Sequence, residues 1–175
     1  MRELSDERLV REFMRRLGAR VAAPGRVYLT GGATAVLHGW RASTVDVDIA
    51  VEAERDAVLR EIPALKEELG INVELASPSD FLPELPGWRD RCLFIVREGR
   101  LDFFHYDPYA QALAKIERGH ARDNEDVREI LARGLVRPVE LLRLHEAIES
   151  QLYLYPAVHP SSLRRALRET LGMSS

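Results

Sequence analysis

Two carboxylates and a pair of glycines, close together in the first third of the chain, are the residues best suited to chemistry. The segment Val27–Val51 reads VYLTGGATAVLHGWRASTVDVDIAV. Asp46 and Asp48 alternate with apolar residues, as in a half-buried strand, so their side chains share one face about 7 Å apart. If the two carboxylates converge to about 5 Å, they repel each other by about 3 kcal/mol at an effective dielectric of about 20. The pair therefore predicts a divalent cation, which carboxylates hold beside phosphate oxygens.

The glycines predict a phosphate site next to these carboxylates. Gly31 and Gly32 follow the short apolar run Val27–Leu29 and precede a segment that is compatible with a helix. This order predicts a strand, a turn and a helix in succession. Glycine amides can approach an anion closely because glycine has no Cβ, and a helix N-terminus attracts negative charge. The hydroxyl of Thr30 or Thr34 would add a further donor.

Other well-known phosphate sites do not fit this spacing. A dinucleotide-binding unit needs G-x-G-x-x-G and an acid at the far end of its second strand, whereas here the glycines are adjacent and Asp46 enters its strand early. A Walker-type loop needs Gly-Lys-Ser or Gly-Lys-Thr, which does not follow the turn. The five histidines lack zinc spacing, and no G-x-S-x-G elbow predicts a serine hydrolase.

Taken together, these residues resemble the nucleotidyltransferase superfamily with the DNA polymerase β-like catalytic fold. The pattern is Gly-Gly, a helix and then D-x-D, here GGATA from Gly31 and RASTVDVD from Arg41. It is most similar to small bacterial members, namely AbiEii-like toxins and related uncharacterised nucleotidyltransferases, and it extends loosely to about Leu135. Gly32 stands where many active relatives carry serine.

The resemblance implies an α+β fold, in which a mixed β-sheet is flanked by helices and followed by extra C-terminal helices. It implies transfer of a nucleoside monophosphate from an NTP to an acceptor hydroxyl on RNA, protein or a small molecule, with Mg²⁺ or Mn²⁺ as cofactor. Asp46 and Asp48 would hold the metal and, with a third acid, form the catalytic set. The residues expected to bind the nucleotide are Gly31, Gly32, Thr34, Arg41 and Lys115.

Two residues are candidates for the third acid. Glu74 lies on a predicted strand, Ile71–Leu75, and resembles the acid on the third strand of minimal family members. Asp102 lies on the second arm of a predicted hairpin, formed by Cys92–Val96 and Leu101–His105. We favour Glu74 and keep Asp102 as the alternative.

Further along, Asp107 and Pro108 predict the start of a helix, with aspartate as N-cap and proline at the first helical position. The following segment resembles the family's lysine-containing helix and its R-x-x-D-x-x-D motif, in which Lys115 would reach nucleotide phosphates. A solvated lysine is the alternative. Asp123, three residues before Asp126, is interpreted as part of a capping box.

Composition and length are those of one compact enzyme domain. We expect a nucleotidyltransferase-like domain over residues 1–175, with its core at about 20–135 and a helical extension at about 136–175. Ser5 is expected to cap an opening helix that Gly18 ends. The chain has 46% hydrophobic residues. It shows neither a signal peptide nor an apolar run long enough to span a membrane, so we expect a cytoplasmic protein without a membrane partner.

Charge does not indicate a nucleic-acid partner, because the net charge is −3. Arginines cluster near both ends of the chain, but acids alternate with them, so solvated helix faces are favoured over an RNA surface. A second hypothesis belongs to another functional class. In it the protein keeps the fold and binds nucleotide without turnover, as a toxin-antitoxin or interaction module with an antitoxin as partner. Gly32 and the ambiguous third acid motivate it.

Overall fold

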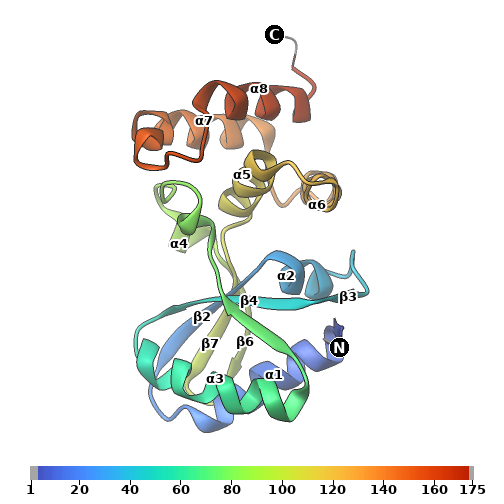
Figure 1. Cartoon of the computed structure of the whole chain (residues 1–175), viewed down its shortest axis with the longest axis vertical. Coiled ribbons are helices and arrows are strands. Elements are labelled where there is room, and N and C mark those ends of the chain that lie inside the picture. Colours follow the sequence, from blue (N-terminus) through green and yellow to red (C-terminus); the bar gives the residue numbers. More distant parts are fainter. Residues whose placement is uncertain (1–3, 174–175) are drawn as a thin grey trace. The chain divides into compact units, whose positions relative to one another are not determined.

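The computed structural model describes residues 4–173 and divides the chain into two compact units (Figure 1). The described part of the first unit comprises residues 4–77 and 92–106. The second comprises residues 78–91 and 107–173. The single domain expected over residues 1–175 stays a prediction.

A five-stranded mixed sheet, in the order β5-β4-β2-β7-β6, is the framework of the first unit. Its strands are β2 (Gly25–Thr30), β4 (Asp46–Glu52), β5 (Asn72–Leu75), β6 (Leu93–Glu98) and β7 (Leu101–His105). β2 is antiparallel to β4 and parallel to β7, while β4 is parallel to β5 and β6 is antiparallel to β7. Two short strands, β1 (Ser5–Asp6) and β3 (Ser43–Thr44), pair separately.

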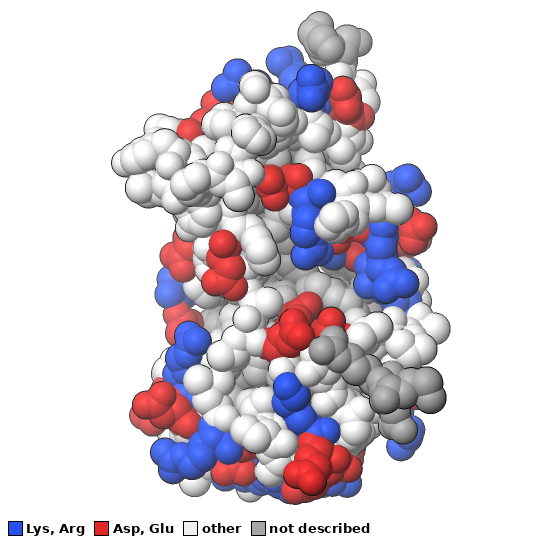
Figure 2. Space-filling view, viewed as in Figure 1, with Lys and Arg blue, Asp and Glu red and all other residues white. Residues whose placement is uncertain are grey.

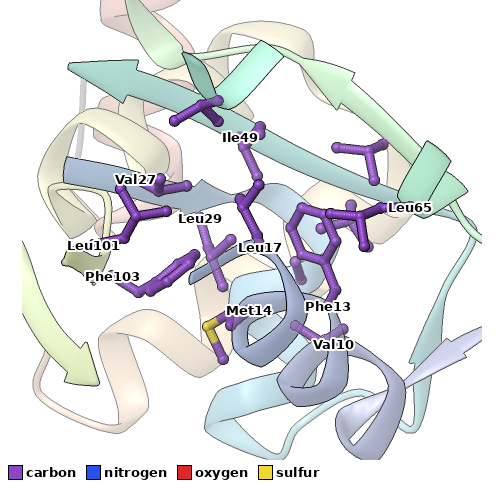
Figure 3. Close-up of a cluster of buried hydrophobic side chains, with 14 of the residues drawn as sticks. Val10, Phe13, Met14, Leu17, Val27, Leu29, Ile49, Leu65, Leu101 and Phe103 are labelled. Carbon is purple, nitrogen blue, oxygen red and sulfur yellow. The ribbon is translucent and has the colours of Figure 1, made fainter. Parts of the chain in front are cut away.

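Three helices flank this sheet, so the predicted α+β fold with a mixed, helix-flanked sheet is confirmed. They are α1 (Glu7–Arg20), α2 (Gly31–His38) and α3 (Arg55–Leu69). α1 and α3 pack together against one face of the sheet (Figure 1). Figure 3 shows Phe13 and Leu17 of α1 among strand side chains such as Leu29. Each such large apolar side chain contributes about 1.5–3 kcal/mol when fully buried.

The predicted cap of α1 was wrong by one residue. Asp6 is the N-cap, and its side chain accepts the amide of Leu9 at 2.8 Å. Ser5 instead lies in β1 opposite Thr44, with its side chain fully buried. Serine and aspartate are both good caps, so the choice between them depended on the pairing of β1 with β3, a contact between distant segments.

The predicted end of α1 at Gly18 was also wrong, because the helix continues to Arg20. Gly18 is buried inside the helix against the hairpin of β6 and β7. A Cβ at this position would overlap the carbonyl oxygen of Glu98 and lie 2.6 Å from its carbonyl carbon. The glycine therefore permits close packing of α1 on the hairpin rather than ending the helix.

The second unit is helical. Its elements are η1 (Pro78–Asp80), α4 (Trp88–Arg91), α5 (Pro108–Arg118), α6 (Ala121–Ala132), α7 (Pro138–Ile148), η2 (Glu149–Leu154) and α8 (Pro160–Thr170). α5 packs against α6, α7 and α8. The predicted start of α5 is confirmed, because Asp107 accepts the amide of Tyr109 at 3.0 Å and Pro108 is the first helical residue. Within residues 4–173, no helix is long and apolar enough to cross a membrane.

Candidate active site

The favoured acids, Asp46, Asp48 and Glu74, lie at one end of the sheet, beside the N-terminus of α2. The strand register places Thr30 opposite Asp48 and Asp48 opposite Glu74. Alternation along each strand turns these three side chains away from the face that α1 and α3 cover. Adjacent strands are about 4.8 Å apart, so the three residues form a row across β2, β4 and β5. Asp46, two residues before Asp48, shares their face.

Asn72 joins the acids of β4 and β5. Its side-chain amide donates to Asp46 Oδ1 at 2.7 Å and to Glu74 Oε1 at 2.8 Å. One neutral donor between two carboxylates orients both and offsets part of their repulsion. We did not predict Asn72 from the sequence. The available signal was its position two residues before Glu74 in the same strand, which places both side chains on one face.

The start of α2 requires glycine at position 31, both for its backbone conformation and for the space beside it. The φ of +59° at Gly31 favours glycine, and a Cβ there would lie 2.6 Å from Asp48 Oδ2. The Asp48 carboxylate therefore lies against the first residue of the helix, where the helix dipole favours negative charge. A phosphate bound at the same N-terminus would meet this carboxylate, so both can be held together only with a cation between them.

Gly32 is required by a different neighbour, Thr44. A Cβ on Gly32 would overlap the Thr44 hydroxyl and lie 2.7 Å from the Thr44 Cβ. Thr44 is buried, and its hydroxyl donates to the backbone carbonyl of Asp46 at 3.0 Å. Thr44 therefore takes the space that a side chain at position 32 would need, and it fixes the backbone that carries Asp46. This contact was not predicted from the sequence, although Thr44 precedes Asp46 by two residues.

Thr30 and Thr34 were considered as hydrogen-bond donors to phosphate. The hydroxyl groups of both form hydrogen bonds within the first unit. Thr30 Oγ1 donates to the carbonyl of Ala76 at 3.4 Å. Thr34 is buried, and its hydroxyl donates to the carbonyl of Leu29 at 3.0 Å and lies 3.1 Å from His105 Nδ1. A hydroxyl has one hydrogen, so His105 Nδ1 is the donor to Thr34. Binding of nucleotide by Thr34 stays a prediction.

His105 makes the first unit sensitive to acid. It is buried and stacks on His38, with ring centroids 4.0 Å apart. Burial, together with the positive potential of His38 and Arg11, lowers the pKa of His105 from 6.5 to about 3. The unfolded chain therefore binds more protons than the folded chain between these two values, so stability falls as the pH drops through that window.

We expect this residue to lower the free energy of unfolding by up to about 1.4 kcal/mol per pH unit below pH ~6. Urea denaturation at pH 6 and pH 4 measures the effect. His105→Gln should remove this part of the pH dependence, whereas the control His159→Gln, at an exposed position, should keep it. An unchanged pH slope in His105→Gln would contradict the assignment.

Asp102, the alternative third acid, lies at the other end of the sheet. It is opposite Arg26, which precedes Thr30 by four residues, or about 13 Å along β2. Arg97 donates to Asp102 at 2.6 and 2.9 Å and, as the main cause, lowers the pKa of this carboxyl group. The geometry thus places Glu74, rather than Asp102, beside the two carboxylates of β4.

Lys115 lies on α5 in the second unit, inside a buried ion-pair network. Its Nζ is 2.6 Å from Asp126 and 3.6 Å from Asp123, and Arg118 also donates to Asp123 at 2.6 and 2.9 Å. The predicted cap was wrong, because His120 is the N-cap of α6 and Asp123 lies within its first turn. The Asp123 carboxylate is engaged by two cations from α5 instead. Contact of Lys115 with nucleotide stays a prediction.

Arg41 comes after α2 in the chain, but its side chain lies near the N-terminus of this helix. One terminal nitrogen of its guanidinium, Nη1, is 3.3 Å from the position that a Cβ on Gly32 would take. This location is compatible with the predicted contact to a nucleotide phosphate. In the first unit, the structure therefore brings together these predicted site residues: Gly31, Gly32, Arg41, Asp46, Asp48 and Glu74.

Several arginines near the start of the chain are paired with acids on α1 and α3. Arg15 and Arg16 donate to Glu12, and Arg16 and Arg20 reach Glu68. Figure 2 shows basic and acidic side chains interspersed on the face that it draws. These pairs agree with the interpretation of α1 as a solvated helix face.

Asp46 and Asp48 supply the donors that a hard cation prefers. Mg²⁺ typically takes one or two protein carboxylates and completes its octahedron with water and substrate phosphate oxygens. Among residues 4–173, no three His, Cys, Asp or Glu side chains form a cluster that could hold a metal ion by themselves. The donor set therefore fits an ion that arrives with nucleotide, and it does not fit a closed structural metal site.

The chain was compared with protein families, curated proteins and solved structures. A family model described as a nucleotidyltransferase of unknown function (DUF6036) matches residues 8–166, which include parts of both units and the acids Asp46, Asp48 and Glu74. No curated protein and no solved structure matches the chain.

Proposed function

The chain belongs to this family of nucleotidyltransferases, and from that premise we propose that it transfers a nucleoside monophosphate from an NTP to an acceptor hydroxyl. The observation that carries the proposal is the row of Asp48 and Glu74, with Asp46 beside it, at the N-terminus of α2. Negative side chains next to an anion-binding helix end are unfavourable for phosphate unless a cation is shared. Substrate phosphate and metal would therefore bind together.

The roles of the residues follow from their positions. The backbone amides at Gly31 and Gly32 and the guanidinium of Arg41 would bind the phosphates. Asp46 and Asp48 would hold Mg²⁺ or Mn²⁺, which supplies charge neutralisation to the nucleotide and the departing pyrophosphate. Asn72 would keep the carboxylates of Asp46 and Glu74 in place.

In the proposed reaction, the acceptor oxygen attacks the α-phosphorus and a new P–O bond forms. The bond from the α-phosphorus to the bridging oxygen of the β-phosphate breaks, and pyrophosphate leaves. Glu74, the exposed member of the acidic row, would take the proton of the acceptor hydroxyl. Most of the rate enhancement would come from holding acceptor and nucleotide in line.

A labelling experiment tests this proposal. The protein is incubated with each α-labelled NTP, with Mg²⁺ or Mn²⁺, and with total RNA, a protein extract or no added acceptor. We expect a labelled product and released pyrophosphate, both lost when EDTA removes the metal. Absence of labelled product with every nucleotide and acceptor, despite intact fold by circular dichroism, would count against transferase activity.

Gly32 favours a second candidate, a nucleotide-binding member without turnover that acts with a partner such as an antitoxin. Thr44 fills the space beside Gly32, so position 32 cannot offer the serine hydroxyl that many active relatives carry. Isothermal titration calorimetry distinguishes the two candidates. Metal-dependent binding of NTP without labelled product would favour the binding module, whereas labelled product would favour the enzyme.

A further inference from the structure

A small cavity in the second unit lies apart from the acidic row. It is formed by α7, η2 and α8, and its volume is about 180 Å³. Three kinds of polar side chain line it: the imidazole of His145, the carboxylates of Glu146 and Glu149, and the guanidinium groups of Arg164 and Arg168. Neither the predicted site nor the proposed function uses any of these residues.

The buried side chain of His145 has one ring nitrogen without a polar partner among the described residues. It is 2% exposed, and its Nε2 has no hydrogen-bond partner in the described part of the chain. The closest carboxylate oxygen, Glu149 Oε1, is 3.7 Å away, which is too far for a hydrogen bond. Burial lowers the pKa of His145, which favours the neutral form of the ring. A buried polar atom without a partner costs about 1–3 kcal/mol, so the site calls for a polar ligand atom.

Two arginines of α8 give the cavity groups that can bind an anion. Arg164 is engaged by Glu149, with nitrogen-to-oxygen distances of 2.7 and 2.8 Å. Arg168, one turn further along α8, lines the same cavity and makes no ion pair within residues 4–173. Glu146 and Arg168 are both exposed at the cavity, so water and salt screen both charges. An unpaired guanidinium and an unpaired imidazole nitrogen therefore line one cavity.

We propose that this cavity binds a phosphate group, either inorganic phosphate or the phosphate of a nucleoside monophosphate, through Arg168 and His145. Phosphate suits both partners, because guanidinium groups bind its oxygens two at a time and a further oxygen can accept from the Nε2–H of a neutral imidazole. The site does not depend on the proposed transferase activity and stands if that activity is absent.

Nuclear magnetic resonance of the histidine side chains tests the proposal on the full chain. Inorganic phosphate and adenosine monophosphate are titrated separately at constant ionic strength and pH, with chloride and adenosine as controls. We expect saturable shifts of the His145 ring nitrogens with either phosphate compound and none with the controls. Tighter binding of the monophosphate would identify a nucleotide as the source, and equal binding would identify phosphate itself.

Two variants of α8 form a matched pair for this experiment. Arg168→Gln should weaken phosphate binding by about tenfold or more. Arg165→Gln removes an exposed arginine that does not line the cavity and should leave the affinity unchanged. The proposal is overturned if the His145 resonances do not respond to phosphate, or if Arg168→Gln and Arg165→Gln bind phosphate as the unchanged chain does.

Discussion

Replacement of Asp48 by asparagine should lower nucleotidyl transfer by about a thousandfold or more. Asparagine keeps the size of the side chain but removes one of the two negative charges that would hold the cation. Its amide nitrogen could also face the amides at the start of α2, because Asp48 Oδ2 lies close to Gly31. The same loss is expected for Asp46→Asn. Initial rates of labelled product formation at saturating NTP and Mg²⁺ measure the effect.

Asp102→Asn is the matched control for this experiment. Asp102 is an aspartate on the same sheet face, but it lies at the far end of the strands and is held by Arg97. Its replacement should leave transfer within about twofold of the unchanged chain, while Glu74→Gln should reduce it by about a hundredfold. Full activity in Asp48→Asn, or a loss in Asp102→Asn as large as that in Glu74→Gln, would refute the proposed site.

Gly32→Ala should destabilise the first unit by about 3 kcal/mol, because the new Cβ overlaps the buried hydroxyl of Thr44. Either Thr44 or the N-terminus of α2 must move, so nucleotide binding should weaken as well. Urea denaturation gives the free energy of unfolding. Gly25→Ala is a suitable control, since its nearest neighbour would be a Leu101 methyl group at 3.3 Å, which can move, and we expect a loss below about 1 kcal/mol.

A double variant tests whether Thr44 is the cause. Thr44→Ala removes the overlapping oxygen. The double variant should therefore lose less free energy of unfolding than the sum of the losses in Gly32→Ala and Thr44→Ala. Thr44 would not restrict position 32 if the two losses of unfolding free energy were strictly additive. The same conclusion would follow if Gly32→Ala destabilised the chain no more than Gly25→Ala does.

Patterns among residues adjacent in the chain were sufficient to predict much of the fold. Alternation predicted β4, the glycine pair predicted the start of α2, and Asp107 with Pro108 predicted the start of α5, because each depends on residues adjacent in the chain. The resemblance carried by these motifs predicted the nucleotidyltransferase superfamily, which the family match confirms.

Three local interpretations were wrong for a common reason. Ser5, Gly18 and Asp123 were each assigned to a helix end from neighbouring residues. In the structure, Ser5 belongs to β1, Gly18 packs against Glu98, and Asp123 is engaged by cations of α5. Contacts with residues outside the helix concerned therefore decided what each residue does.

By itself, the sequence determined that Asp46 and Asp48 share one face of a strand, because strand alternation alone requires it. Only the tertiary structure decided which acid accompanies them. Glu74 and Asp102 both lie on strands, and the register of β4 with β5 and of β2 with β7 separates them. Register depends on how distant strands pair, and that pairing is a property of the whole packed sheet rather than of any single segment.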